Sequence, residues 1–208
     1  MKIHLRDRNP EMVKAWKVMW KPADKDIEIS EGDIFDGPIT DAIVSPANSW
    51  GFLDGGIDAV YSHRWPHLQA KLQKHLAENF YGELPVGCAT IIPIHDGQKK
   101  EDFNWLISAP TMRIPQNVQN TVNAYLAFRA SLIEVLRYNH NLSLNYHLSP
   151  IETILCPGMG TAIGRMPHQI AALQMYHAWK RICIESLELG DDLTIAWNNH
   201  EFLRRGLI

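Results

Sequence analysis

The stretch AIVSPANSWGFLDGGID, at residues 42–58, decides the fold class of this sequence. It opens with a short, mostly apolar run from Ala42 to Ser45, which indicates a buried strand. A loop with three glycines follows, and apolar residues then recur at helical spacing from Ile57 onward. Glycines let backbone N–H groups approach a ligand closely, and the N-terminus of a helix attracts anions. The stretch therefore predicts a strand, an anion-binding turn and a helix.

A second stretch, ETILCPGMGTAIGRMP at residues 152–167, repeats this plan. Its strand runs from Glu152 to Cys156, its turn holds three glycines, and a helix begins after Pro167. Successive backbone N–H groups in such a turn can form a nest for phosphate. One glycine-rich turn carries little weight, because any tight strand-to-helix turn favours glycine. Two turns at corresponding positions predict a ligand with more than one phosphate.

Strands and helices alternate along the remaining sequence. Further strands are predicted at Lys2 to Arg6, Ile27 to Ile29, Cys88 to Ile94, Asn104 to Ala109 and Leu193 to Trp197. The predicted helices begin at Ile57 with a break at Pro66, cover Val118 to Leu136, and begin again at Pro167, while Val13 to Trp20 fits either a strand or a short helix. This alternation predicts an α/β fold with a mixed or largely parallel sheet. Such sheets bind ligands at the carboxyl ends of their strands.

Composition and charge exclude several classes of protein. The 208 residues are 46% hydrophobic and 21% charged, which is typical of one soluble globular domain. With 20 Lys and Arg against 23 Asp and Glu, the net charge of −3 gives no general attraction to nucleic acid or to an anionic membrane, and we expect neither as a partner. Met1 to Pro10 lacks the apolar stretch of a signal peptide, so we expect a cytoplasmic protein.

Cysteine spacing and nucleotide motifs narrow the function further. Cys88, Cys156 and Cys183 lie far apart in apolar surroundings and form no CxxC pair, so we expect buried free thiols and no metal site. The sequence has no GxxxxGK[ST] and no GxGxxG after its first strand, which excludes a P-loop NTPase and argues against a Rossmann dehydrogenase. Ser49 and Ser62 lack a nucleophile-elbow sequence, which argues against a Ser-His-Asp hydrolase.

Four segments together resemble a macro domain of a bacterial and phage branch. They are Gly32-Asp33-Ile34, Ser45-Pro46-Ala47-Asn48, Gly55-Gly56-Ile57-Asp58 and the stretch from Gly158 to Pro167. The resemblance covers about residues 27–197, so it implies a single macro domain over residues 1–208 with short N- and C-terminal extensions. It also implies a three-layer α/β/α sandwich around a mixed sheet, which binds ADP-ribose or a related NAD-derived ligand without a cofactor or metal.

The resemblance assigns a role to three polar side chains, and each has a structural alternative. It implies that Asp33 accepts a hydrogen bond from the adenine amino group beside the Ile34 backbone, although an aspartate after glycine is also a common turn or N-cap residue. It implies that Asn48 contacts the distal ribose, although a loop asparagine also bonds to nearby backbone. Asp58 matches an aspartate that activates water or a ribose hydroxyl, yet an aspartate there also stabilises the helix dipole.

The other implied contacts lie on the two glycine loops and on the last predicted strand. The implied ligand-binding residues are Ala47, Gly55, Gly56, Ile57, Gly158, Met159, Gly160, Thr161, Ala162 and Ile163. Trp197 either stacks on the adenine or packs in the core. Trp50 and Phe52 either form an aromatic wall or pack under the first loop.

The resemblance leaves more than one function open. The first is a hydrolase that acts on ADP-ribosyl-protein, ADP-ribose 1″-phosphate or O-acetyl-ADP-ribose. The second is a binding module without chemistry, which reads ADP-ribosylated protein or holds an NAD-derived signal. A third is an assembly protein that has lost the pocket, and Asp33, Asn48 and Asp58 argue against it.

Overall fold

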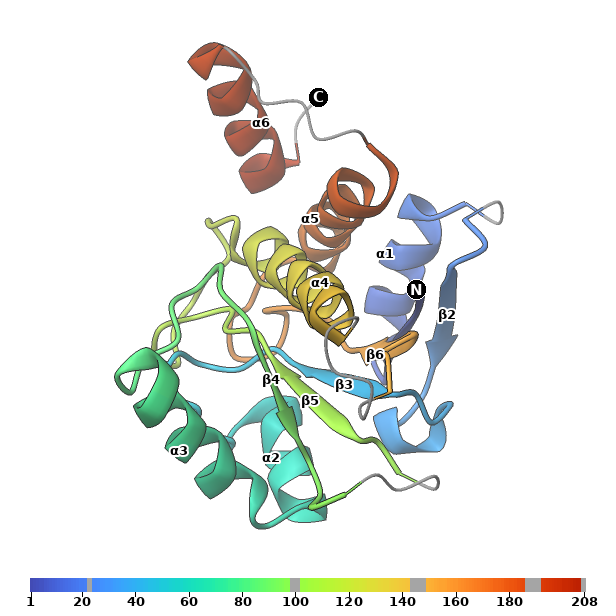
Figure 1. The fold of residues 1–208 in the computed structure, drawn as a ribbon. Coiled ribbons are helices and arrows are strands. Elements are labelled where there is room, and N and C mark those ends of the chain that lie inside the picture. Colours follow the sequence, from blue (N-terminus) through green and yellow to red (C-terminus); the bar gives the residue numbers. More distant parts are fainter. Residues whose placement is uncertain (22–23, 98–101, 143–148, 186–191, 207–208) are drawn as a thin grey trace.

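A central six-stranded sheet organises the chain, with strand order β2-β1-β6-β3-β5-β4 (Figure 1). It is seen in a computed structural model that describes residues 1–21, 24–97, 102–142, 149–185 and 192–206. The strands are β1 (Lys2–Asp7), β2 (Ile27–Glu31), β3 (Ala42–Ser45), β4 (Thr90–Pro93), β5 (Trp105–Ser108) and β6 (Thr153–Cys156). All neighbouring pairs are parallel except β4 with β5. The sheet is therefore mixed, as the sequence predicts.

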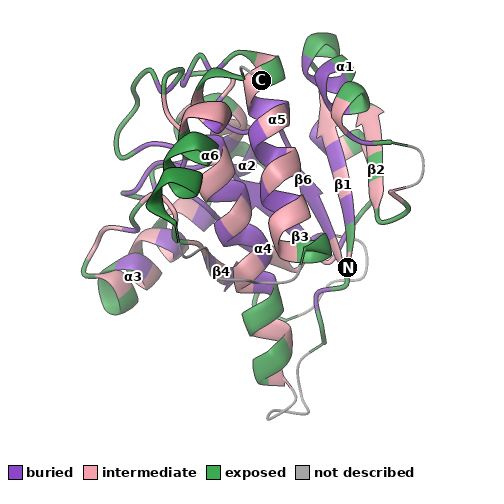
Figure 2. Cartoon of the chain, turned by 90° about the horizontal axis from the view of Figure 1, so that it is seen from above, coloured by how far each residue is buried: buried purple, intermediate pink, exposed green. Residues whose placement is uncertain are grey.

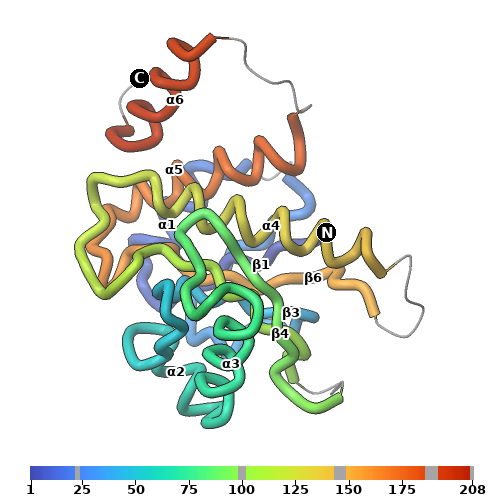
Figure 3. The backbone as a smooth tube through the Cα atoms, turned by 60° about the vertical axis from the view of Figure 1, so that its left-hand side comes forward, coloured from blue at the N-terminus to red at the C-terminus, as the bar shows by residue number. Residues whose placement is uncertain are grey.

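Helices cover both faces of the sheet (Figures 1 and 3). The helices are α1 (Pro10–Met19), α2 (Gly56–Arg64), α3 (Leu68–Phe80), α4 (Asn123–Leu142), α5 (His168–Trp179) and α6 (Leu193–Arg205). One core cluster joins α1, α4 and α5 to the sheet through residues such as Val44, and a second joins α2 and α3 through residues such as Ile43. Because neighbouring residues of a strand point to opposite faces, β3 is buried from both sides. The result is the expected three-layer α/β/α sandwich.

Local sequence signals set two helix boundaries. Asn9 caps α1, because its side chain accepts a hydrogen bond from the Glu11 N–H and Pro10 occupies the first turn. The segment left open between strand and helix at Val13 to Trp20 is therefore mostly helix. The break at Pro66 is confirmed, because α2 ends at Arg64 and α3 begins at Leu68.

The prediction of a final strand at Leu193 to Trp197 is wrong. These residues form the first turns of α6, where the Asp192 side chain caps the helix by accepting a hydrogen bond from the Thr194 N–H. The alternating Leu193, Ile195 and Trp197 imitate a strand, but all three are exposed on a helix that contacts α5. Figure 1 shows α6 beyond α5, away from the sheet.

The prediction of three buried thiols holds for one cysteine only. Cys156, at the end of β6, is buried, whereas Cys88 and Cys183 are exposed. Cys88 precedes β4 in a turn, where its N–H bonds to the Pro85 carbonyl, so the strand begins later than predicted. Cys183 lies in the π-helical turn Lys180–Ile184 that follows α5. Figure 2 shows how burial concentrates on the sheet and the inner faces of its helices.

Candidate functional site

A cavity of about 360 Å³ opens at the carboxyl ends of β1, β3 and β6. Its position follows from the topology, because parallel strands bring their following loops to one edge of the sheet. Both glycine loops predicted from the sequence line it. The lining residues that carry the argument below are Arg6, Asp7, Arg8, Asp33, Asn48, Phe52, Asp54, Gly55, Asp58, Gly158, Ile163 and His168.

Asp33 lines the cavity and also caps the short 3-10 helix η1 (Ile34–Asp36). Its Oδ1 accepts a hydrogen bond from the Phe35 N–H at 2.8 Å, and its Oδ2 pairs with the Arg8 guanidinium. The Arg6 Nε donates to the Asp33 carbonyl oxygen at 2.6 Å. The cap predicted as a structural alternative is therefore confirmed, and Asp33 also lines the cavity, with Ile34 beside it.

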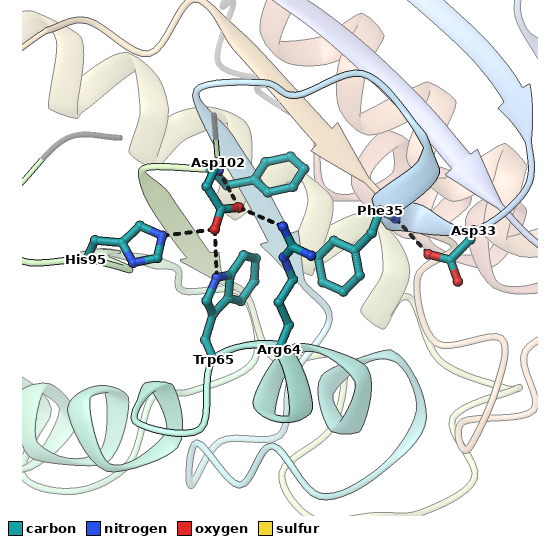
Figure 4. A network of polar contacts seen from close by, with 7 residues as sticks. Asp33, Phe35, Arg64, Trp65, His95 and Asp102 are labelled. Carbon is teal, nitrogen blue, oxygen red and sulfur yellow. Dashed lines mark hydrogen bonds and ion pairs between the residues drawn. The ribbon is translucent and has the colours of Figure 1, made fainter. Parts of the chain in front are cut away.

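A polar network contacts Phe35 of η1 (Figure 4). The Arg64 guanidinium lies 4.7 Å from the centre of the Phe35 ring and 3.6 Å from the Asp102 carboxylate. Asp102 also accepts hydrogen bonds from Trp65 Nε1 and from the Phe103 N–H, and it contacts His95 Nε2 at 3.1 Å. Burial alone would raise the pKa of Asp102, but these donors and Arg64 hold it below its ordinary value.

Asn48 fixes the shape of the first loop. Its Oδ1 accepts hydrogen bonds from the N–H groups of Trp50 and Phe52, and its Nδ2 donates to the Phe52 carbonyl oxygen at 2.8 Å. Phe52 lines the cavity, whereas Trp50 lies outside it with the Arg113 guanidinium 5.3 Å from its ring. Asn48 thus has the local backbone bonds of a loop asparagine while one side of it borders the cavity.

Asp58 is a buried carboxyl in the first turn of α2, and it borders the cavity. The Ser45 hydroxyl, at the end of β3, donates to its Oδ1 at 2.6 Å. Burial raises the pKa of Asp58 to about 7, and the nearby Asp54 carboxylate contributes in the same direction, while the bond from Ser45 opposes the rise. The carboxyl can therefore gain or lose a proton near neutral pH.

The second loop lies against an aspartate that the sequence analysis did not single out. The Gly158 N–H donates to Asp7 Oδ2 at 3.1 Å, and a Cβ on Gly158 would lie 2.8 Å from that oxygen. The loops also approach each other, because a Cβ on Gly55 would lie 2.7 Å from Ile163 Cδ1. A side chain in place of either glycine would crowd the cavity.

The structure brings most of the predicted site residues to one place. Those that line the cavity are Asp33, Ile34, Ala47, Asn48, Gly55, Gly56, Ile57, Asp58, Gly158, Gly160, Thr161, Ala162 and Ile163. Met159 instead packs in the core, where it is fully buried. Trp197 lies on α6 with 63% of its surface exposed, and it does not line the cavity. Its placement beside the adenine depended on the strand that the structure replaces with a helix.

Several lining residues were missed by sequence reasoning. Four of them lie in β1 or directly after its end: Arg6, Asp7, Arg8 and Asn9. A fifth, His168, is the first residue of α5, and its Nε2 lies 3.2 Å from Asn9 Nδ2. The signal that would have found the first group is the rule already used for β3 and β6, because β1 is a parallel strand between β2 and β6. His168 carries no such signal.

Among the residues that the structure describes, no three His, Cys, Asp or Glu side chains are placed to hold a metal ion together. None of the helices in the described ranges combines the length and the apolarity needed to cross a bilayer.

Comparison with known proteins finds one relative that is similar in sequence and several structures that are similar in fold. No protein-family model matches the chain. An uncharacterised protein of Aquifex aeolicus strain VF5 is 26% identical over 178 residues, which is 83% of this chain and 95% of the relative.

The solved structures most useful for comparison are bacterial macrodomains. The macrodomain of Mycobacterium tuberculosis DarG matches with a TM-score of 0.53 and 19% identity, over 73% of this chain and 88% of its own. The Oceanobacillus iheyensis macrodomain with ADP matches with a TM-score of 0.53 and 20% identity, over 71% of this chain and 70% of its own. Thermosipho africanus DarTG in complex with ADP-ribose matches with a TM-score of 0.54 and 14% identity, over 82% of this chain and 44% of its own. This chain has the macrodomain fold.

Proposed function

We propose that the chain binds ADP-ribose and hydrolyses an ADP-ribose derivative. The candidate substrates are ADP-ribosyl-protein, ADP-ribose 1″-phosphate and O-acetyl-ADP-ribose. The observation that carries the proposal is one cavity bordered by Asp33, Asn48, Asp58 and both glycine loops. Structures of the same fold hold ADP in Oceanobacillus iheyensis and ADP-ribose in Thermosipho africanus.

Each chemical group of ADP-ribose has a counterpart among the lining residues. The Asp33 carboxylate suits the adenine amino group, since an ionised carboxylate only accepts hydrogen bonds. The loops that follow β3 and β6 each lead into the N-terminus of a helix, α2 and α5, where backbone N–H groups favour the diphosphate. In this proposal Gly55, Gly56 and Ile57 hold the diphosphate from one side. Gly158, Gly160, Thr161, Ala162 and Ile163 hold it from the other.

Asp58 is the residue we assign to the chemistry. In its ionised form it takes a proton from water as the water oxygen bonds to the anomeric carbon, and the leaving group departs with the electron pair of the broken bond. Its pKa of about 7 lies in the range that suits a general base. A bound diphosphate raises that pKa further, because a second negative charge disfavours the carboxylate. Turnover should therefore increase as the pH rises through neutrality.

A binding module without chemistry remains the second candidate, and the bonds of Asn48 favour it. Three hydrogen bonds tie its amide to the backbone of residues 50 and 52, which leaves one N–H to orient a ribose. Such a module would hold ADP-ribose, or an ADP-ribosylated protein, without releasing a product.

Calorimetric titration of ADP-ribose tests the binding half of the proposal. Saturable binding is expected, and Asp33→Ala should weaken it about 10- to 100-fold, the range for a lost bond to a charged group. Asp36→Ala is the matched control, since Asp36 is exposed in η1 and does not line the cavity. An absence of heat and of binding in the wild-type chain would refute the proposal.

Product release from the three candidate substrates tests the chemical half. Asp58→Asn should abolish turnover and keep ADP-ribose binding, because the amide has nearly the same shape but cannot take the proton. Binding without any product from wild-type protein would replace the hydrolase with the binding module. An Asp58→Asn variant that turns over substrate as fast as the wild-type protein would refute the role of Asp58.

A further inference from the structure

We propose that Ser45 is a positioning residue for Asp58, which fixes the carboxyl so that its second oxygen, Oδ2, faces the ligand and exchanges the proton. The inference rests on the proposed function for its catalytic meaning, but it is carried by geometry alone. Neither the sequence motifs nor the implied ligand contacts give the Ser45 side chain a role.

The two side chains lie on different elements and meet within the protein. Ser45 is the last residue of β3 and has no exposed surface, while Asp58 lies in the first turn of α2 and is 7% exposed. They are thirteen positions apart in the sequence, yet the Ser45 hydroxyl donates to Asp58 Oδ1 at 2.6 Å. A bond of this length to a carboxylate belongs to the stronger, charge-assisted class.

The direction of this hydrogen bond assigns different tasks to the two carboxyl oxygens. Asp58 Oδ1 is the acceptor that the structure gives to the hydroxyl proton of Ser45. If Oδ1 carried the proton and donated to Ser45 instead, the buried hydroxyl would lose that acceptor, and an unpaired buried donor is costly. The proton of the neutral form therefore belongs on Oδ2, the oxygen that Ser45 leaves free.

Other groups around Asp58 change its charge balance but do not fix its orientation. Asp54, in the first loop, acts on it only through charge and is exposed. Tyr61, one turn further along α2, donates its hydroxyl to the Val44 carbonyl oxygen at 3.1 Å. Tyr61 also interacts electrostatically with Asp58 and with two residues at the ends of β6 and β1, Cys156 and Asp7. Within the described parts of the chain, Ser45 is thus the side chain that holds Asp58 directly through a hydrogen bond.

The test measures the titration of the Asp58 carboxyl carbon by NMR, in wild-type protein and in Ser45→Ala. Loss of a bond to the charged form should raise the midpoint by about one pH unit, a tenfold change in the proton equilibrium. Turnover at pH 7 should fall about tenfold through kcat, with KM changed less than threefold. Ser45→Thr keeps the hydroxyl and should restore both values.

Ser131→Ala is the matched control, since Ser131 is a fully buried serine whose hydroxyl donates to the Ala127 carbonyl oxygen within α4. It should leave the midpoint of Asp58 unchanged. A folded Ser45→Ala variant with an unchanged or lowered midpoint would overturn the inference.

Two features keep the test decisive. If Ser45→Ala does not fold, hydroxyl exchange in the wild-type chain tests the inference instead. A hydrogen-bonded Ser45 hydroxyl proton should exchange slowly with water and give its own NMR signal. A rapidly exchanging hydroxyl would overturn the inference. If wild-type protein shows no turnover, the proposed hydrolysis fails, whereas the NMR midpoints continue to test Ser45 independently.

Discussion

Replacing Asp58 with asparagine should stabilise the chain, and the gain should grow with pH. Asparagine keeps the shape of the side chain and an oxygen that can accept the Ser45 hydroxyl, but it never becomes charged. In the wild-type chain the pKa of Asp58 rises on folding from 3.8 to about 7, chiefly because of burial. Between these two values the folded chain holds a proton that the unfolded chain has released. Stability must therefore fall as the pH rises through this window, and it levels off above it.

The size of the effect follows from the same two pKa values. A rise from 3.8 to about 7 corresponds to about 4 kcal/mol of lost stability once the pH exceeds both values. Almost none of this cost is present at pH 4, so the stability gained by Asp58→Asn should be about 4 kcal/mol larger at pH 8 than at pH 4. This is a large fraction of the stability of an ordinary domain.

Urea unfolding of both proteins at several values between pH 4 and pH 8 measures the difference directly. Other titrating groups cancel in the comparison, because the two chains share them. Asp36→Asn controls for the removal of a negative charge, since Asp36 is exposed and lies outside the cavity. A stability difference between wild type and Asp58→Asn that stays constant with pH, or shrinks as the pH rises, would refute the reasoning.

Three further substitutions test other parts of the account. Asp54→Asn should lower the pKa of Asp58, because the Asp54 charge now raises it, and should tighten ADP-ribose binding severalfold; weaker binding in calorimetry would contradict this. Gly164→Ala should destabilise the chain by about 1–3 kcal/mol in urea unfolding, since its Cβ would lie 2.5 Å from the Gly160 carbonyl oxygen. Trp197→Ala should change the affinity for ADP-ribose less than twofold, because Trp197 is exposed on α6, and a larger loss would place it at the site after all.

Sequence patterns located the elements that are buried or sharply interrupted. Ala42 to Ser45 was predicted with the observed bounds of β3, because a strand covered on both faces is a continuous apolar run. Pro66 separated α2 from α3 for a steric reason that any sequence shows. The strand prediction at Leu193 to Trp197 was wrong, because a short alternating run does not reveal whether the sheet has a free edge for another strand.

Contacts between distant residues account for what was missed at the site. Asp58 was identified from its motif, but its bond to Ser45 depends on how β3 and α2 pack together. The pairing of Arg8 with Asp33 joins residues 25 positions apart, and no periodicity encodes it. The motif thus indicates which side chains we propose to meet a ligand, while the partners that hold them come from the fold.

An NMR titration of amide signals with ADP-ribose tests the central claim, that both glycine loops close on one ligand. Saturable shifts should concentrate at Asp33, Gly55, Gly56, Gly158 and Gly160, while the amides of α6 stay unchanged. Saturable shifts confined to other surfaces, or no shifts at millimolar ADP-ribose, would contradict the account.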